Sequence, residues 1–189
     1  MNLIVALGNP GRKYEDSRHN LGWLTVDTLP FCSSLMWREK FKGEFFKITE
    51  HGNDFVFLKP QTFMNLSGES VRPAMDFFKI AAEDVLVIHD ELDLPFGTLS
   101  FKDGGGLAGN NGLKSINEQL STPKFKRLRM GIGRPVHGDV SSHVLSQFSA
   151  EEKPLLEDYY KLGADAITQY MKVGFGKAAN KFSKKSIIN

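Results

Sequence analysis

Short apolar runs rich in β-branched and aromatic residues alternate along this chain with segments whose apolar residues recur at helical spacing. The runs predict strands and the helical spacing predicts helices, so the alternation indicates an α/β fold. The sequence His51-Gly52-Asn53-Asp54 predicts a hairpin turn, so the sheet should be mixed. The predicted strands are 2–7, 44–50, 55–58, 85–88, 98–101 and 127–131, and the predicted helices are 20–29, 68–78, 111–120 and 150–171.

The chain has 189 residues without a repeat or a Ser/Pro-rich linker, so we expect one domain over residues 1–189. Its architecture should be a three-layer sandwich, with a twisted mixed β-sheet flanked by helices. We expect Asn65 or Ser67 to cap the helix 68–78, and Ser149 with two following glutamates to start the last helix.

The composition excludes several classes of protein. Cys32 is the only cysteine, so an internal disulfide and a Cys-rich zinc site are excluded. The first apolar run is short and has no basic leader, so it predicts a strand and not a signal peptide or a membrane span. We therefore expect a cytosolic protein.

The net charge of +2 hides two basic segments. Residues 114–134 contain six basic residues and one acidic residue, and residues 172–189, a basic C-terminal tail, contain five lysines and no acid. Lysine-rich tails are often only solvated, but two separate basic segments favour a polyanionic partner.

Functional side chains of α/β proteins gather in the loops that leave the strands at their C-terminal ends. This rule selects loops 8–19, 59–68, 89–93 and 102–111. His19 lies near the start of a helix, whose dipole favours the neutral imidazole that a general base requires. Asp90 or Asp93 follows a buried strand and is a candidate to orient His19. Two alternatives remain: a solvated acidic turn, and a divalent-metal site with His89, Asp90, Glu91 and Asp93 as possible ligands.

The loop 102–111 contains a G-x-G-x-x-G pattern between a strand and a helix, as in dinucleotide-binding proteins. Basic residues stand where such a site requires an acid, and the pattern does not follow the first strand. Binding of NADP therefore remains a weak alternative to an anion-binding loop or a mobile lid.

Asn9, Asn65 and Asn111 lie on three of these loops and offer uncharged amide donors for a carbonyl or its oxyanion. Phe63 and Met64 would form an apolar wall beside them. No nucleophile motif is present, and Cys32 lies among apolar residues, so water activated by His19 is the expected nucleophile of a hydrolase.

Five ordered motifs resemble the bacterial-type peptidyl-tRNA hydrolases over nearly the whole chain, weakly beyond about Phe148. They are GNPGRKYEDSRHNLG, KPQTFMNLSG, HDELDLPFG, KDGGGLAGNNGLKS and RLRMGIGRP. The resemblance implies a cytoplasmic, usually monomeric esterase without metal or other cofactor. Such an enzyme hydrolyses the ester between the peptide and the 3′ ribose of peptidyl-tRNA and returns free tRNA to translation.

The resemblance also implies roles for individual residues. His19 is similar to the catalytic base, Asp90 to the carboxylate that holds its basic form, and Asn9 to the residue that tests acylation of the amino-acid nitrogen. Lys102 and Arg129 match basic positions associated with the tRNA 5′ phosphate, to which Lys126 and Arg127 would add affinity. Positions that contact the tRNA end or the peptide correspond to Tyr14, Phe63, Asn65 and Asn111.

The chain departs from the family pattern at two positions. Asn110 stands where the family usually has a histidine, and Ser100 stands where it has a basic residue. The support for Asn111 and the strength of the phosphate clamp therefore remain open. These departures leave a second hypothesis, an RNA-binding protein of this fold that has lost turnover, whereas the intact His19 and Asp90 favour an enzyme.

Overall fold

The computed structural model describes residues 1–188; Asn189, the last residue of the predicted basic tail, lies outside the described residues. An eight-stranded sheet has the order β2-β3-β4-β1-β5-β7-β6-β8. Its strands are β1 (Asn2–Ala6), β2 (Arg38–Lys40), β3 (Gly43–Glu50), β4 (Asn53–Pro60), β5 (Val85–Glu91), β6 (Thr98–Asp103), β7 (Lys126–Gly131) and β8 (Lys185–Ser186).

The sheet is mixed, as predicted. The central strands β4, β1, β5 and β7 are parallel, whereas β3 and β6 pair antiparallel with their neighbours. The predicted hairpin joins β3 to β4, with left-handed backbone at His51 (φ 50°) and Gly52 (φ 76°). That geometry suits a two-residue turn between twisted strands.

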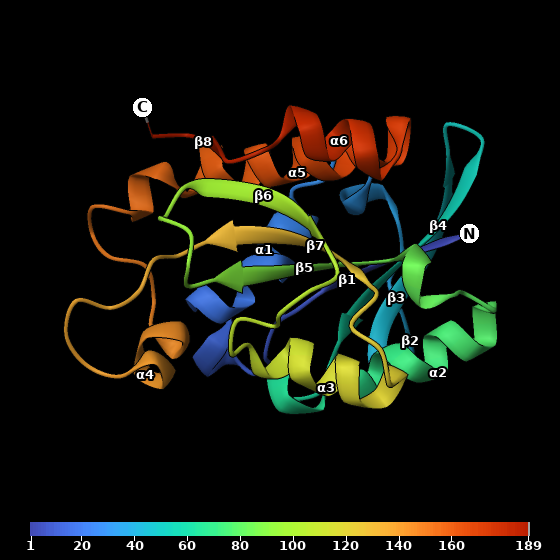
Figure 1. Ribbon diagram of the computed structural model, residues 1–189, viewed down its shortest axis with the longest axis horizontal. Helices are drawn as coiled ribbons and strands as arrows, with labels where there is room; N and C mark the ends of the chain where they lie inside the picture. Colours follow the sequence, from blue (N-terminus) through green and yellow to red (C-terminus); the bar gives the residue numbers. More distant parts are fainter. Residues whose placement is uncertain (189) are drawn as a thin grey trace.

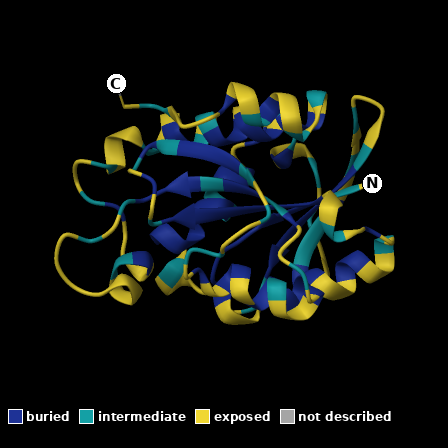
Figure 2. Cartoon of the chain, in the orientation of Figure 1, coloured by how far each residue is buried: buried dark blue, intermediate teal, exposed yellow. Residues whose placement is uncertain are grey.

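Helices cover both faces of the sheet and form the predicted three-layer sandwich (Figure 1). The helix α2 (Gly68–Phe78) and the helix α3 (Asn111–Leu120) pack on one face. The opposite face carries α1 (Leu21–Asp27), α5 (Leu156–Val173) and α6 (Phe175–Lys181), while α4 (Val140–Leu145) lies at the end of the sheet where β5 and β7 finish. Figure 2 shows a buried sheet between helices whose outer faces are exposed.

Two apolar cores follow from the alternation of side chains along the strands. Ile4, Leu86 and Leu128 face the α1 and α5 side, whereas Leu3 and Val87 face the α2 and α3 side. The strand β1 and residues 85–88 of β5 are buried on both faces and therefore consist of continuous apolar runs. Among the described residues, no helix is both long and apolar enough to cross a bilayer.

Several local predictions were wrong. Neither Asn65 nor Ser67 caps α2 through its side chain, because a 3-10 helix, η4 (Met64–Leu66), precedes it and the Ser67 hydroxyl donates to the Met64 carbonyl. The last long helix starts at Leu156, after the 3-10 helix η6 (Lys153–Leu155). Ser149 and Glu152 nevertheless bond each other's backbone N–H groups, as in a capping box.

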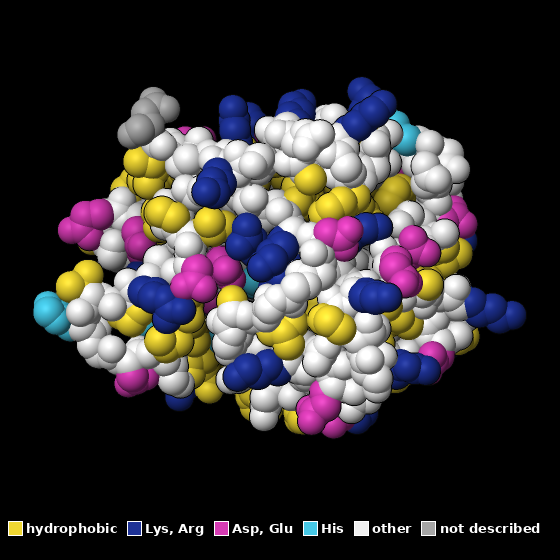
Figure 3. Space-filling model, viewed as in Figure 1, with side chains coloured by type: hydrophobic (Ala, Val, Ile, Leu, Met, Phe, Trp, Pro, Cys, Tyr) yellow, Lys and Arg dark blue, Asp and Glu magenta, His cyan; other side chains and the backbone are white. Residues whose placement is uncertain are grey.

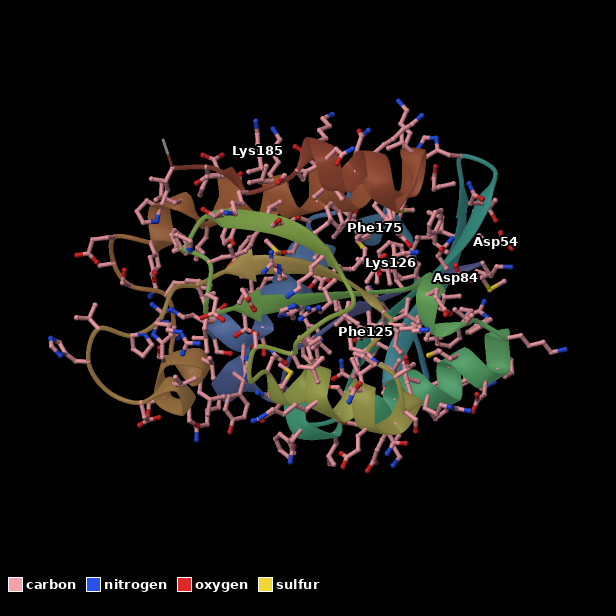
Figure 4. All side chains as sticks on the ribbon, viewed as in Figure 1. Asp54, Asp84, Phe125, Lys126, Phe175 and Lys185 are labelled. Carbon is pink, nitrogen blue, oxygen red and sulfur yellow. The ribbon has the colours of Figure 1, made fainter. Side chains whose placement is uncertain are left out.

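The predicted basic tail is largely ordered structure. It comprises the end of α5, the helix α6 and the strand β8, which pairs antiparallel with β6. Figure 4 shows Lys185 beside this edge of the sheet. The tail therefore completes the fold in addition to carrying positive charge.

Candidate active site

A cleft of about 510 Å³ opens at the C-terminal ends of the parallel strands. The loops after β1, β4 and β5 reach it, as expected for loops that leave parallel strands at their C-terminal ends. It is lined by Asn9, Tyr14, His19, Phe63, Met64, Asn65, Asp90, Glu91, Leu92, Ala108, Gly109, Asn110, Asn111, Val140, Ser141, Val144 and Leu145. The structure thus brings eight of the ten predicted site residues to one cleft.

The fourth loop reaches the cleft by a different route from the one expected. Because β6 runs antiparallel to β7, Lys102 and the start of the glycine-rich loop lie away from the C-terminal edge of the parallel strands. The loop then runs back across the sheet, and only its end, Ala108 to Asn111, lines the cleft. The prediction that the whole loop leaves the sheet at this edge was therefore wrong.

His19 and Asp90 form a buried pair in the cleft. Nδ1 of His19 lies 2.9 Å and 2.8 Å from the two carboxylate oxygens of Asp90, and the two residues are 8% and 3% exposed. Burial lowers the pKa of His19, but the charge of Asp90 and its hydrogen bond outweigh burial and raise that pKa above its usual value. With Nδ1–H donating to Asp90, the basic lone pair of the neutral ring is on Nε2.

Asn110 supports this pair from the start of α3. Its side-chain oxygen accepts from the backbone N–H groups of Gly112 (2.9 Å) and Leu113 (3.1 Å), and its amide nitrogen donates to Asp90 Oδ1 at 3.4 Å. An asparagine therefore both caps α3, which begins at Asn111, and contacts the carboxylate. The cap also occupies two of the N–H groups that a dinucleotide phosphate would use.

Asn20 is a site residue that the sequence analysis missed, since it was interpreted only as the start of a helix. It is fully buried, and its side chain bonds both the N–H (2.8 Å) and the carbonyl (3.0 Å) of Asn9. The Asn9 side-chain oxygen accepts from the Met64 N–H at 2.7 Å. Consequently, the amide nitrogen of Asn9 remains available to donate.

The substrate-facing wall combines exposed apolar and amide groups. Phe63 is 56% exposed although it lines the cleft, and Asn65 and Asn111 are also exposed there. The backbone of α3 comes close to Met64, because a Cβ at Gly112 would lie 2.6 Å from its sulfur. Glycine at this position therefore lets the loop after β4 pack against the helix that presents Asn111.

A second group of charged side chains lies outside the cleft, on the sheet face that α2 and α3 partly cover. Arg127 and Arg129 of β7 face this side, as does Lys102 of β6. Arg127 is 1% exposed and donates to the Gly104 carbonyl at 2.7 Å, and the side chain of Arg129 is 19% exposed. We call Lys102, Arg127 and Arg129 the basic face. Lys and Arg side chains gather near the centre of the view in Figure 3.

One ion pair balances part of the charge of the basic face. Glu91 is 3% exposed, and its carboxylate lies 3.7 Å from Nη1 of Arg129. His89 is fully buried on the same side of β5, and burial foremost lowers its pKa to about 4. His89 is thus neutral and adds no charge at pH 7. Its ring bonds the backbone carbonyl of Asp90 at 2.8 Å but lies on the opposite side of β5 from the Asp90 side chain, because successive residues of a strand face opposite sides.

The first basic segment is divided between two places, because Lys126 lies apart from Arg127 and Arg129 and lines a hollow together with Lys172 and Lys177 of the second segment. Lys126 precedes Arg127 and lies at the far end of the sheet, where it donates to the Glu83 carbonyl and approaches the ring of Phe175 at 5.5 Å (Figure 4). The prediction that Lys126 acts together with Arg127 and Arg129 is not supported by this placement. Ser100, the other departure, is 6% exposed and pairs in register with Arg129.

The metal alternative has no geometric support. Among residues 1–188, no three His, Cys, Asp or Glu side chains converge as a metal site would require. Cys32 is buried, its thiol donates to the Val26 carbonyl at 3.0 Å, and burial raises its pKa to about 11. This thiol packs in the core, as the sequence predicted.

An α/β sandwich with a histidine–carboxylate pair in a cleft is a common architecture for enzymes that activate water. The family model for peptidyl-tRNA hydrolase matches residues 3–189. The peptidyl-tRNA hydrolase of Listeria welshimeri is 42% identical over 97% of this chain and 100% of its own length, and that of Geotalea uraniireducens is 44% identical over 98% of both chains. The chain belongs to the peptidyl-tRNA hydrolase family.

The solved structures agree with this assignment. The crystal structure of peptidyl-tRNA hydrolase from Acinetobacter baumannii is similar with a TM-score of 0.90 and 35% identity, over 98% of this chain and 96% of that one. A crystal structure of a peptidyl-tRNA hydrolase in complex with N-propanol also has a TM-score of 0.90, at 36% identity. The α/β fold expected from the sequence is therefore confirmed.

Proposed function

We propose that this protein hydrolyses the ester between the peptide and the 3′ ribose of peptidyl-tRNA, with a water molecule activated by His19. The observation that carries this proposal is the buried His19–Asp90 pair, which lines the same cleft as three asparagine amides. Membership in the peptidyl-tRNA hydrolase family supports the substrate class.

In the first step, Nε2 of His19 accepts a proton from water while the water oxygen bonds to the ester carbonyl carbon. Asp90 holds the ring in the required tautomer and stabilises the imidazolium that forms. The carbonyl oxygen becomes an oxyanion, for which Asn9, Asn65 and Asn111 are the candidate amide donors. An ester is an activated acyl group, so one general base with oriented donors is adequate equipment.

In the second step, the carbon–oxygen bond to the 3′ ribose breaks, and the imidazolium returns its proton to the ribose oxygen. The products are a peptide carboxylic acid, which ionises at neutral pH, and tRNA with a free 3′ hydroxyl. His19 is then neutral again, so the cycle needs no other proton donor.

We assign to Asn9 the test for an acylated nitrogen. Its side-chain oxygen accepts from the Met64 N–H, which orients the free amide N–H groups of Asn9 as donors for the carbonyl of a peptide bond. An unblocked aminoacyl ester has an ammonium group there and no such carbonyl. The site would then reject it through the loss of a hydrogen bond and the burial of an uncompensated charge.

The contacts with tRNA are divided between the cleft and the basic face. Tyr14, Phe63 and Met64 would contact the 3′ end or the peptide, whereas Lys102 and Arg129 would bind the 5′ phosphate, with Arg127 holding the loop beside them. Recognition by phosphates and shape requires no base-edge contacts. We propose that the protein acts as a monomeric single domain.

The decisive experiment compares hydrolysis of N-acetylaminoacyl-tRNA with hydrolysis of the same aminoacyl-tRNA unblocked, without added metal. We expect release of the N-acetylated amino acid and little turnover of the unblocked substrate. Binding of tRNA without any product would instead favour an RNA-binding protein that has lost turnover.

A further inference from the structure

Arg18 precedes His19, and both terminal nitrogens of its guanidinium bond to a distant part of the chain. Nη1 donates to the Ser146 hydroxyl at 2.7 Å and to the Gln147 carbonyl, and Nη2 lies 2.6 Å from the Glu152 carboxylate. The residue is only 6% exposed. A buried arginine with these partners loses several charge-assisted hydrogen bonds at once when it is replaced.

Neighbouring contacts strengthen this connection. The backbone N–H of Arg18 donates to the Ser146 carbonyl at 3.0 Å, and Ser17 forms an isolated β-bridge with Gln147. The guanidinium lies 5.2 Å from the centre of the Phe148 ring. We call this set of contacts the Arg18 connection. It joins the 3-10 helix η2 (Arg18–Asn20), which contains His19, to the segment that directly follows α4.

The helix α4 forms one wall of the cleft. Val140, Ser141, Val144 and Leu145 line the cleft, and Val140 and Leu145 are 40% and 38% exposed. On its N-terminal side, α4 follows the loop 133–139, which is mostly exposed and includes Val136 at 90% exposure. The Arg18 connection at its C-terminal side, together with the buried Val144, therefore holds this wall against the base.

We propose that Arg18 is a positioning residue that sets the place of the α4 wall relative to His19, and so determines how strongly longer apolar peptides are preferred over short acyl groups. This inference rests on the proposed function. An exposed apolar wall beside the base binds a peptide side chain, whereas an acetyl group is too small to use it fully. A planar guanidinium can hold the three acceptors together, which an ammonium group cannot reproduce.

The test measures kcat and KM for two substrates, N-acetylaminoacyl-tRNA and a peptidyl-tRNA with several apolar residues. In Arg18→Lys we expect KM for the longer substrate to rise about tenfold and KM for the acetylated one to change about twofold or less. Glu152→Gln should show the same pattern more weakly. The pH midpoint of kcat should stay unchanged, because the His19–Asp90 pair is intact. Arg72→Lys, in an exposed pair with Asp76 on α2, is the matched control.

Equal losses for both substrates, or no loss for either, would overturn the inference. A shifted pH midpoint would also overturn it, because Arg18 would then act on the ionisation of the pair. If Arg18→Lys does not fold, Glu152→Gln decides by the same ratio of KM values. Failure of the unmodified protein to hydrolyse either substrate would contradict the proposed function itself, which separates the two failures.

Discussion

The His19–Asp90 pair and the basic face lie on opposite sides of β5, and their charges are balanced to different extents. In the cleft, the carboxylate of Asp90 has a histidine partner at 2.8 Å, so the pair balances its own charge when the ring is protonated. On the basic face, the one ion pair that residues 1–188 give to Lys102, Arg127 or Arg129 is that of Arg129 with the Glu91 carboxylate, at 3.7 Å. We therefore expect the cleft to be preorganised for chemistry and the basic face to bind an external anion.

The largest effect should come from removing the base. In His19→Ala, we expect kcat to fall by about 10² to 10⁴-fold, the usual contribution of a general base, while affinity for tRNA stays the same. Single-turnover hydrolysis and equilibrium tRNA binding measure the two quantities separately. His51→Ala, at the exposed tip of the β3–β4 hairpin, is the control. Undiminished turnover in His19→Ala would contradict the mechanism.

Asp90→Asn should have the next largest effect, about 10²-fold on kcat, because the ring loses the charge that stabilises its protonated form. The direction in which the pH profile of kcat shifts also tests the role of Asp90. Turnover requires neutral His19, so activity rises with pH through its pKa, which Asp90 raises. Without that charge the pKa falls, and the acid limb of the kcat profile should move to lower pH. An unmoved limb would show that Asp90 does not control the ionisation of His19.

The fold was predictable wherever local pattern and tertiary partners agree. The helix α3 and the hairpin between β3 and β4 lie where the periodicity and the turn residues place them. The strand β2 was missed because all three of its residues are exposed at a sheet edge, and β8 because two residues carry no periodicity. The direction of β6 also depends on long-range pairing, so the path of the glycine-rich loop could not be deduced locally.

The polar groups that line the candidate site could be predicted from the sequence, whereas the residues that hold them in place through hydrogen bonds could not. The expectation that loops at the C-terminal ends of parallel strands meet brings His19 and Asp90 together. It does not reveal that Asn20 bonds the backbone of Asn9, or that Arg18 bonds the Gln147 carbonyl. Both residues adjoin His19 in the sequence, which was the available signal. Their partners depend on tertiary packing, which no spacing rule supplies. The roles given to the cleft residues stay predictions.

Removing a cation from the basic face should affect binding and not chemistry. In Arg129→Gln and in Lys102→Gln, we expect affinity for tRNA to fall about tenfold, the equivalent of a charge-assisted hydrogen bond worth about 1.5 kcal/mol. The slope of log affinity against log salt concentration should become shallower by about one unit, because one phosphate contact is lost. Turnover of a minimal ester without a 5′ phosphate should not change. Lys161→Gln, on α5 across the sheet, is the control. If affinity for RNA with a 5′ hydroxyl falls by the same factor, the substituted side chain does not contact the 5′ phosphate.

The smallest effect should be a gain. We expect Glu91 to compete with an external anion for Arg129, so Glu91→Gln should bind 5′-phosphorylated acceptor-stem RNA about threefold more tightly, because the long 3.7 Å separation makes the internal ion pair a weak competitor. Affinity for the same RNA with a 5′ hydroxyl should stay within error. Because Glu91 also lines the cleft, the pH midpoint of kcat should be measured in the same variant. Weaker binding of both RNAs would mean that Glu91 holds Arg129 in its binding position, and the contrast between a balanced cleft and an unbalanced basic face would fail.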